Sequence, residues 1–296
     1  MTQKFLLPLV AFAAFSLIPF LRADEPAPVV APRVVVDEAW PPLLENSVNG
    51  IATIETDEFL VVPENVKAAM QKPGVMQFVM AKKTPRVELA YHRDLPNRAL
   101  NGTGWSAWGD IAVASDGKVY SGIGDHGNNN GGGHAYVYCW DPATKTLKQI
   151  ANANLAAGAG KGDVTWSKVH ARIVEGKDGK IYFTCTLNNG ALAFQSKWTE
   201  RVPGGQIFQY DPATGKTIVV GAIPGEVTPT TILDRERNIL YLNMEGKTAA
   251  SDVALTAFDL TTNKIVYQSP HDAVTGSRNL ALARNGAVYF SGKDGI

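Results

Sequence analysis

A glycine-rich stretch, residues 122–134, holds several side chains that could do chemistry. It contains Asp125 and two of the five histidines of the chain, His126 and His134. A third histidine, His170, precedes the inner strand of the next predicted unit. Imidazole and carboxylate groups together suit Mn²⁺, Zn²⁺ or another divalent metal. We therefore predict His126, His134 and His170 as candidate metal ligands. The alternative is a solvated loop with surface histidines, because no spacing here is diagnostic of a metal site.

Two aspartates are the candidate catalytic residues of such a site. Asp110 and Asp125 could act as general acid or base beside a bound metal. No other cofactor is predicted: the stretch contains Gly-x-Gly-x-x-Gly, but it does not open a helix, as a dinucleotide fingerprint must. The two cysteines, Cys139 and Cys185, form no Cys-x-x-Cys motif. We predict two buried free thiols, with a disulfide as the alternative.

The elements that must position these residues follow an internal repeat. The motif Asp-Gly-Lys-Val-Tyr at 116–120 recurs at 178–182 and, in looser form, at 237–241 and 285–289. A second motif, Asp-Pro-Ala-Thr followed by Lys or Gly, occurs at 141–145 and 211–215, with a looser copy at 259–263. The repeated tyrosines are 62, 59 and 48 residues apart. Such periods are typical of four-stranded propeller blades.

Each unit is predicted to contain four strands. An Asp-Gly turn joins two apolar runs into a hairpin, and the Asp-Pro-Ala-Thr motif makes a second turn before the last strand. The sequence therefore predicts an all-β fold, a β-propeller over residues 43–296. Its blades are expected at about 108–155, 169–223 and 229–270, with a divergent blade at 43–97 and a partial one at 278–296. In the divergent blade we expect a hairpin of 50–54 with 58–62, a helix at 64–71, and strands at 75–80 and 86–91.

The last unit stops after its second predicted strand, which would leave exposed strand edges. Either strands of the N-terminal segment complete this unit and close a small ring, or the chain is a fragment of a larger propeller. The proportions of the units favour the second interpretation, a fragment of a ring with six to eight blades.

A ring of polar residues is expected at the start of the inner strands. Superposing the units aligns Asp110, Arg172, Thr231 and Asn279, and strand alternation directs them away from the apolar positions that follow. These residues could line a central channel, or they are ordinary strand-start residues solvated by water. We predict four ligand-binding residues at this end: Trp108, Arg172, Thr231 and Asn279.

The N-terminus has the pattern of an export signal. An apolar run follows Lys4 and ends near Ala23, so we predict a cleaved signal peptide at 1–23 and a proline-rich leader at 24–42. Its prolines and short length argue against a membrane anchor. The 28 basic and 28 acidic residues balance, which argues against a nucleic-acid partner. A secreted or periplasmic protein without membrane attachment is expected.

One unit resembles a known kind of repeat. Residues 167–184 read Ser-Lys-Val-His-Ala-Arg-Ile-Val-Glu-Gly-Lys-Asp-Gly-Lys-Ile-Tyr-Phe-Thr and are followed by the turn at 211–216. This pattern resembles the repeats of virginiamycin B lyase-like and NHL-type propellers, and the resemblance covers the three middle units. It implies a multi-bladed propeller, often extracytoplasmic, in a superfamily whose members include lyases, lactonases and binding modules.

Three functions are compatible with these features. A binding propeller would hold a carbohydrate or protein ligand at its rim or central channel, with tryptophans as flat apolar platforms: Trp105, Trp108, Trp166 and Trp198. A metal-assisted polysaccharide or lactone-type lyase or hydrolase would use the three histidines as ligands. A redox quinoprotein ranks third, because no tryptophan follows the Thr-Gly-Lys turn. We expect a binding propeller and keep the lyase or hydrolase as the alternative.

Overall fold

The computed structural model describes residues 51–290 except for 55–56, 77–79, 91–94, 96–104, 108, 110, 126–132, 160–164, 186–204, 224–229, 244–252 and 271–279. The predicted signal peptide and leader lie outside the described residues. So do five residues of the predicted sites: Trp108, Asp110, His126, Trp198 and Asn279.

Three four-stranded antiparallel sheets form the body of the described structure, and in each the strands pair in chain order. The first sheet contains β3 (Ala112–Val113), β4 (Val119–Gly124), β5 (Ala135–Asp141) and β6 (Thr146–Asn152). The second contains β7 (Val174–Glu175), β8 (Ile181–Cys185), β9 (Gly205–Asp211) and β10 (Lys216–Ile223). The third contains β11 (Thr230–Asp234), β12 (Ile239–Asn243), β13 (Val253–Asp259) and β14 (Lys264–Pro270). A hairpin of β15 (Ala281–Leu282) and β16 (Val288–Tyr289) follows.

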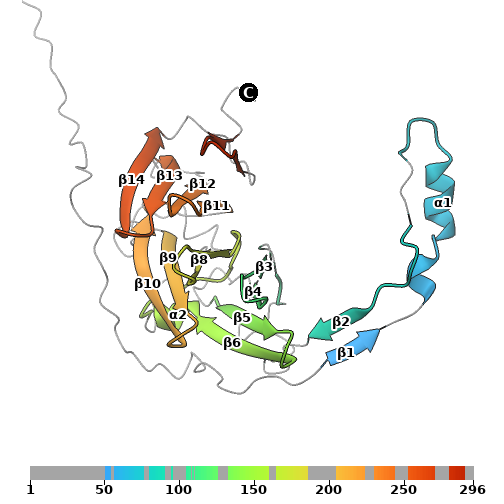
Figure 1. The fold of residues 1–296 in the computed structure, drawn as a ribbon, viewed down its shortest axis with the longest axis horizontal. Coiled ribbons are helices and arrows are strands. Elements are labelled where there is room, and N and C mark those ends of the chain that lie inside the picture. The colour runs from blue at the N-terminus through green and yellow to red at the C-terminus, as the bar shows by residue number, and fades with distance from the viewer. Residues whose placement is uncertain are drawn as a thin grey trace, which may run out of the picture.

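The sheets lie side by side along an arc (Figure 1). The last strand of each sheet, β6, β10 or β14, lies on the outer side of this arc, and the first strand lies toward the inner side. Antiparallel four-stranded sheets stacked in this way are the blades of a β-propeller. The predicted fold class is therefore confirmed, and the described blades form an open arc.

The repeated tyrosines occupy equivalent places. Each lies on the second strand of its unit: Tyr120 on β4, Tyr182 on β8, Tyr241 on β12 and Tyr289 on β16. Tyr120 is 1% exposed, and its ring centroid lies 6.3 Å from that of Tyr210 in the next blade. Burial raises the pKa of both the Tyr120 and the Tyr182 hydroxyl. The prediction made from the repeat is confirmed. Tyr120 and Tyr182 are buried where one blade packs on the next, whereas Tyr241 is half-buried and Tyr289 is exposed.

The interfaces between blades hold the hydrophobic core. Phe183 and Phe208 stack in the cluster between the first and second blades, with ring centroids 5.0 Å apart. Fully burying a side chain of this size stabilises the fold by about 1.5–3 kcal/mol. Cys139 and Cys185 belong to the same cluster as free, buried thiols. This confirms the predicted thiols over the disulfide.

The tight turns explain the glycines and asparagines of the repeat. In four of the units, the turn between the first two strands has a residue with positive φ at the same place: Gly117 (83°), Gly179 (75°), Asn238 (60°) and Gly286 (86°). The turn before the last strand repeats this feature at Lys145 (55°), Gly215 (69°) and Asn263 (55°). Glycine adopts this left-handed region freely and asparagine tolerates it, whereas other residues are disfavoured by roughly 1–2 kcal/mol. Lys145 is the exception to the pattern.

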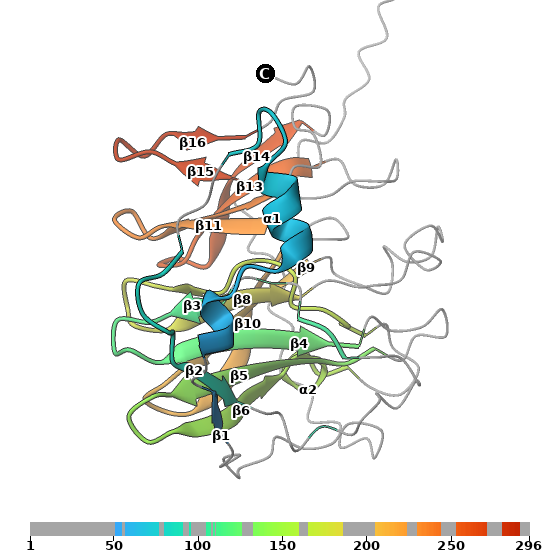
Figure 2. The same cartoon turned by 90° about the vertical axis from the view of Figure 1, so that its right-hand side faces the viewer.

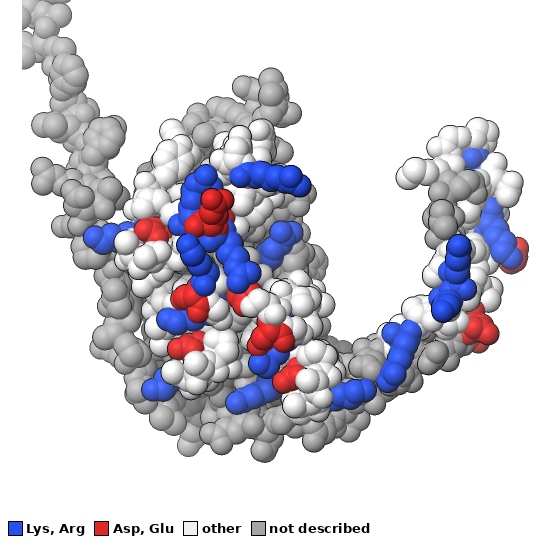
Figure 3. All heavy atoms as spheres, in the orientation of Figure 1, with Lys and Arg blue, Asp and Glu red and all other residues white. Residues whose placement is uncertain are grey.

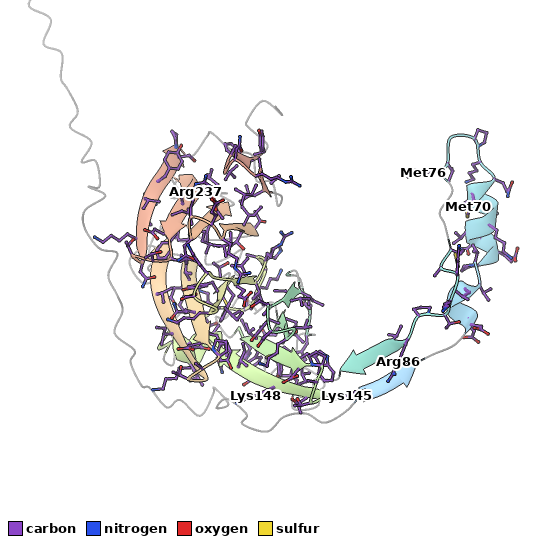
Figure 4. The ribbon with its side chains drawn as sticks, in the orientation of Figure 1. Met70, Met76, Arg86, Lys145, Lys148 and Arg237 are labelled. Carbon is purple, nitrogen blue, oxygen red and sulfur yellow. The ribbon has the colours of Figure 1, made fainter. Side chains whose placement is uncertain are left out.

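Replacing Lys145 by glycine is therefore expected to raise the free energy of unfolding by about 0.5–1 kcal/mol, since the strain of a β-carbon at φ 55° is removed. Lys145 lies at the exposed turn between β5 and β6 (Figure 4). Urea unfolding measures the change, and the reciprocal variant Gly215→Lys should lower stability by a similar amount. A less stable Lys145→Gly variant would contradict this explanation of the turn.

The expected hairpin at the N-terminal end is not formed. β1 (Ile51–Ile54) pairs instead with β2 (Val87–Ala90). In place of a strand at 58–62 the chain forms a 3-10 helix, η1 (Asp57–Leu60). The described residues of the expected strand at 75–80 are not in a strand either. Pro63 has no N–H to give to a strand ladder and suits a helix start, and α1 (Glu64–Met70) begins directly after it, which confirms the predicted helix.

Each blade has two different ends. Tight turns join the first strand to the second and the third to the fourth at one end, the turn face, which projects to the left in Figure 2. The ends of the second strands and the starts of the third strands lie at the opposite end, the loop face. Figure 3 shows basic and acidic side chains intermixed over the turn face. Several form ion pairs, such as Arg237 with Asp234 (2.7 Å) and Arg235 with Glu175 of the neighbouring blade (3.2 Å). In both pairs the arginine is exposed and the carboxylate is largely buried: the side chains of Asp234 and Glu175 are 3% and 11% exposed.

Candidate functional site

Asp125 and His134 face each other at the loop face of the first blade. β4 ends at Gly124 and β5 begins at Ala135, so Asp125 directly follows β4 and His134 directly precedes β5. The backbone N–H of His134 donates to Oδ1 of Asp125 (2.8 Å), and Nδ1 of His134 lies 2.5 Å from Oδ2. Asp125 is 0% exposed and His134 is 5% exposed. The loop predicted at 122–134 thus begins only after β4, and a buried side-chain pair joins its ends.

This pairing fixes the imidazole of His134. A carboxylate bonded to Nδ1 sets the orientation and tautomer of a histidine and directs Nε2 the opposite way. Both oxygens of Asp125 are engaged by His134, and the aspartate is fully buried. The placement of Asp125 fits a residue that positions His134 better than the acid or base that we predicted.

Two aromatic side chains lie against the His134 ring. The Tyr136 ring stacks on it at a centroid distance of 6.3 Å, and the Trp105 ring meets it edge-on at 6.2 Å. Trp105 is held in place by Ser106, whose N–H and carbonyl pair with the backbone of Gly124 (2.8 and 2.9 Å). Tyr136 is buried and Trp105 is half-buried, so the indole retains exposed surface that a ligand could contact.

A segment without regular secondary structure, residues 167–173, passes beside β4 on its way to β7 and bends at Ala171. Alternate residues of the segment are buried: Ser167, Val169, Ala171 and Ile173. The intervening residues are basic: Lys168 and His170, which are half-buried, and Arg172, which is exposed. Buried and less buried residues therefore alternate along the segment, although it is not a strand.

Glycines of the first blade let this segment approach closely. A β-carbon at Gly124 would overlap the carbonyl oxygen of Ser167, and one at Gly122 would overlap the Val169 side chain. A β-carbon at Gly133 would lie 2.5 Å from Cβ of Ser167. The strand that leads to Asp125 and the segment that carries His170 are therefore in direct contact.

A buried amide ties the same parts together. Asn154, in the short helix α2 (Ala153–Ala156), donates through Nδ2 to the carbonyls of Gly133 and Trp166 (both 3.0 Å) and accepts from the Trp166 N–H (2.7 Å). The Gly133 N–H donates to Oγ1 of Thr165 (2.7 Å). These bonds fix the start of β5, and with it His134, relative to the segment before β7.

The structure separates the predicted site residues. Asp125 and His134 meet, and His170 lies on the adjacent segment. Thr231 is 3% exposed and donates its hydroxyl to the carbonyl of Arg172 (2.7 Å), so it joins the third blade to the second. Trp166 is 4% exposed and packs edge-on against Phe208 in the core, which contradicts its expected role as a ligand platform. Among the described residues, no group of three or more His, Cys, Asp or Glu side chains could hold a metal ion.

Two residues of this region were missed in the sequence. Lys168 could have been found from the alternation in Ser-Lys-Val-His-Ala-Arg-Ile, which places a basic residue at every second position. Asn154 has no comparable signal, because an asparagine that follows a predicted strand reads equally well as a turn or helix-cap residue.

Comparison with known proteins adds fold relatives of low similarity. No protein-family model matches the sequence, and no curated protein matches it. Solved structures that resemble it include the extracellular domain of the one-component system BT4673 from B. thetaiotaomicron (13% identity, TM-score 0.42, 71% of this chain and 22% of that one). TolB from Acinetobacter baumannii is 15% identical, with a TM-score of 0.36 over 62% of this chain and 40% of that one. The β-propeller domain of the Trilobed protease from Pyrococcus furiosus is 10% identical, with a TM-score of 0.33 over 55% of this chain and 43% of that one. The chain thus spans less than half of the length of each of these structures. Because these identities and TM-scores are low, we assign the blades from the strand topology of the chain alone.

The helices of the described residues are short. None of them is both long and apolar enough to cross a membrane.

Proposed function

We propose that this chain is an exported β-propeller that binds a carbohydrate at its loop face, beside the first blade. The single observation that supports this most is the half-buried Trp105, which is held against the buried Asp125–His134 pair. A rigid indole beside an oriented imidazole offers an apolar platform for a sugar ring and a polar group for its hydroxyls. A protein ligand at the rim or channel is the other form of this proposal. Trp108 and Asn279 remain proposed members of the same site.

The proposed organisation follows the sequence. We infer a signal peptide at 1–23, a leader at 24–42 and a propeller at 43–296, in a secreted or periplasmic protein of the virginiamycin B lyase-like or NHL-type superfamily. The repeat motif at 167–184 and the apolar N-terminal run support these inferences.

A metal-assisted lyase or hydrolase is the second candidate, and the Asp125–His134 pair favours it. A carboxylate that fixes Nδ1 prepares Nε2 either to accept a proton or to bind a metal. His170 and His126 would be the further ligands, with Asp110 as the acid or base. Metal analysis of the purified protein tests this candidate: one bound divalent ion per chain, lost in a His134→Ala variant, would support it.

Carbohydrate binding is tested with a glycan array and a Trp105→Ala variant. We expect the purified protein to bind at least one glycan and the variant to bind it about tenfold more weakly, since stacking on an aromatic ring contributes about 1 kcal/mol or more. Trp105→Phe keeps a flat ring and should retain most of the affinity. Absence of binding to every glycan, or equal binding by Trp105→Ala, would refute carbohydrate recognition at this site.

A further inference from the structure

We propose that two copies of this chain close one propeller ring, in which β1 and β2 of each copy complete the blade that begins with β15 and β16 of the other. The two copies contribute three complete blades each and share two more, so the ring has eight. Eight blades lie within the usual range of about four to eight. The partner at both ends of the open arc is thus a second copy, whatever ligand the propeller binds.

Two units of the described structure have only two strands each. β15 pairs with β16 and β1 pairs with β2, and neither pair joins another sheet in the described part of the chain. An isolated two-stranded hairpin is at best marginally stable in water, and its open edges can accept a further strand. Because the complete blades have four strands, the two pairs together have the strand number of one blade.

The order of strands along the chain assigns each pair its place in that blade. In the complete blades the strands pair in chain order, and the fourth strand is followed by the first strand of the next blade. β15 and β16 are joined by the turn of a first and second strand, with Gly286 in the place of Gly117 and Gly179. β2 is followed by β3, the first strand of the first blade. β2 therefore takes the fourth place and β1 the third, where it pairs with the free edge of β16.

An aromatic contact recurs between neighbouring blades. The tyrosine on the second strand of one blade packs with the aromatic residue near the end of the third strand in the next. The ring centroids of Tyr120 and Tyr210 lie 6.3 Å apart, and both residues belong to the core between the first two blades. Tyr182 and Phe258 belong to the corresponding core between the second and third blades. This contact marks which faces of two blades belong together.

The two ends of the arc carry the unmatched halves of this contact. Tyr289 of β16 is 61% exposed, whereas the tyrosines in its place in the first two blades are at most 1% exposed. Trp140 of β5 is half-buried, whereas the aromatic residues in its place in the second and third blades are buried. When the half-blade of one copy packs on the first blade of the other, Tyr289 meets Trp140 and both become buried.

The positions of the two strand pairs favour a second copy over closure within one chain. β1 and β2 lie beyond the first blade, and β15 and β16 lie beyond the third, at the other end of the arc (Figure 1). Each copy therefore presents one half of the missing blade at either end. Two such arcs related by a twofold axis complete each other at both ends, as in other symmetric dimers.

Contacts far from the axis of the ring also favour eight blades over four. The Thr217 hydroxyl on β10 donates to the carbonyl of Ile150 on β6 (2.9 Å), which joins the outermost strands of the first two blades. A β-carbon at Gly221 of β10 would lie 2.5 Å from the Phe258 ring of the third blade. Neighbouring blades diverge by about 90° in a ring of four and by about 45° in a ring of eight. Outer strands in contact suit the smaller angle, and hence a ring made by two copies.

Gel filtration with multi-angle light scattering tests the proposal on the purified protein. We expect twice the mass of one chain. Tyr289→Asp places a charge in the proposed contact and should raise the dissociation constant of the dimer about tenfold or more. Tyr267→Asp is the matched control: Tyr267 is 53% exposed but lies on β14, the outermost strand of the third blade, so the dimer should be unchanged. Circular dichroism should show the same fold in both variants.

Hydrogen exchange places the contact on the chain. The amides of β1 and β16 should exchange more slowly in the parent dimer than in Tyr289→Asp, because each strand gains a partner. A parent protein that is a monomer would overturn the proposal and favour completion of the blade by a further part of a longer chain. A dimer that Tyr289→Asp leaves unchanged, or that Tyr267→Asp weakens equally, would overturn this interface. The glycan array decides the carbohydrate proposal independently of these results.

Discussion

Replacing Gly124 by alanine is expected to lower the free energy of unfolding by about 3 kcal/mol, the upper range for overpacking a core. The new β-carbon would overlap the carbonyl oxygen of Ser167, which is backbone and cannot rotate away. Relief requires the first two blades to separate, and their contact holds the largest part of the core, including Val169 and Ile173. Urea unfolding at constant temperature measures the loss.

A matched control lies on the same strand. Ser121→Ala changes a half-buried residue of β4 without adding any atom, so it should stay within about 0.5 kcal/mol of the parent protein, as substitutions without a special contact do. If Gly124→Ala is as stable as Ser121→Ala, the close approach between β4 and the segment at 167–173 does not exist.

Replacing Asp125 by alanine is expected to lower stability by about 3 kcal/mol, because it leaves a buried backbone N–H and a buried imidazole nitrogen without their partner. Asp125→Asn keeps the shape and one acceptor oxygen, so its loss should be smaller. The same pair should be visible by proton NMR as a slowly exchanging His134 Nδ1–H signal in the parent protein. That signal should be absent in Asp125→Ala.

The Asp125 prediction has its own control. Gln209 donates to the Tyr182 hydroxyl (2.8 Å) on the second blade, and Gln209→Leu should lower stability without affecting the His134 signal. A His134 proton that persists in Asp125→Ala would show that another group orients the imidazole. The catalytic alternative would then lose its main support.

The fold was predictable where the sequence acts locally. Gly117 and Gly179 lie in tight turns that need a positive φ, and the tyrosines three residues later, Tyr120 and Tyr182, are buried between blades. The strand pairing that we predicted for the N-terminal unit was wrong, because the true partners are far apart in the sequence. Ile51–Ile54 and residues 58–62 look like a hairpin by composition, but the partner of β1 is β2, more than thirty residues away. Strand propensity does not choose between near and distant partners.

The candidate site was predictable only in part. Its histidines and Asp125 stand out by residue type, but the hydrogen bonds of Asp125 to His134 depend on β4 and β5 placing the loop ends together. We assigned Gly124 to the glycine-rich loop from the sequence. It is instead the last residue of β4, where the lack of a side chain allows close packing against the Ser167 backbone. Trp166 shows the converse: a tryptophan near polar residues suggests a platform, yet tertiary packing places it in the core.

The most direct test of the proposed site is to follow the indole N–H signals of the six tryptophans by NMR while a glycan that binds in the array is added. A ligand at the loop face of the first blade should shift the Trp105 signal. It should leave unchanged the signals of Trp166, buried in the core, and of Trp140, near the turn face. A titration that shifts Trp140 and leaves Trp105 unchanged would place the ligand elsewhere and contradict the proposed function.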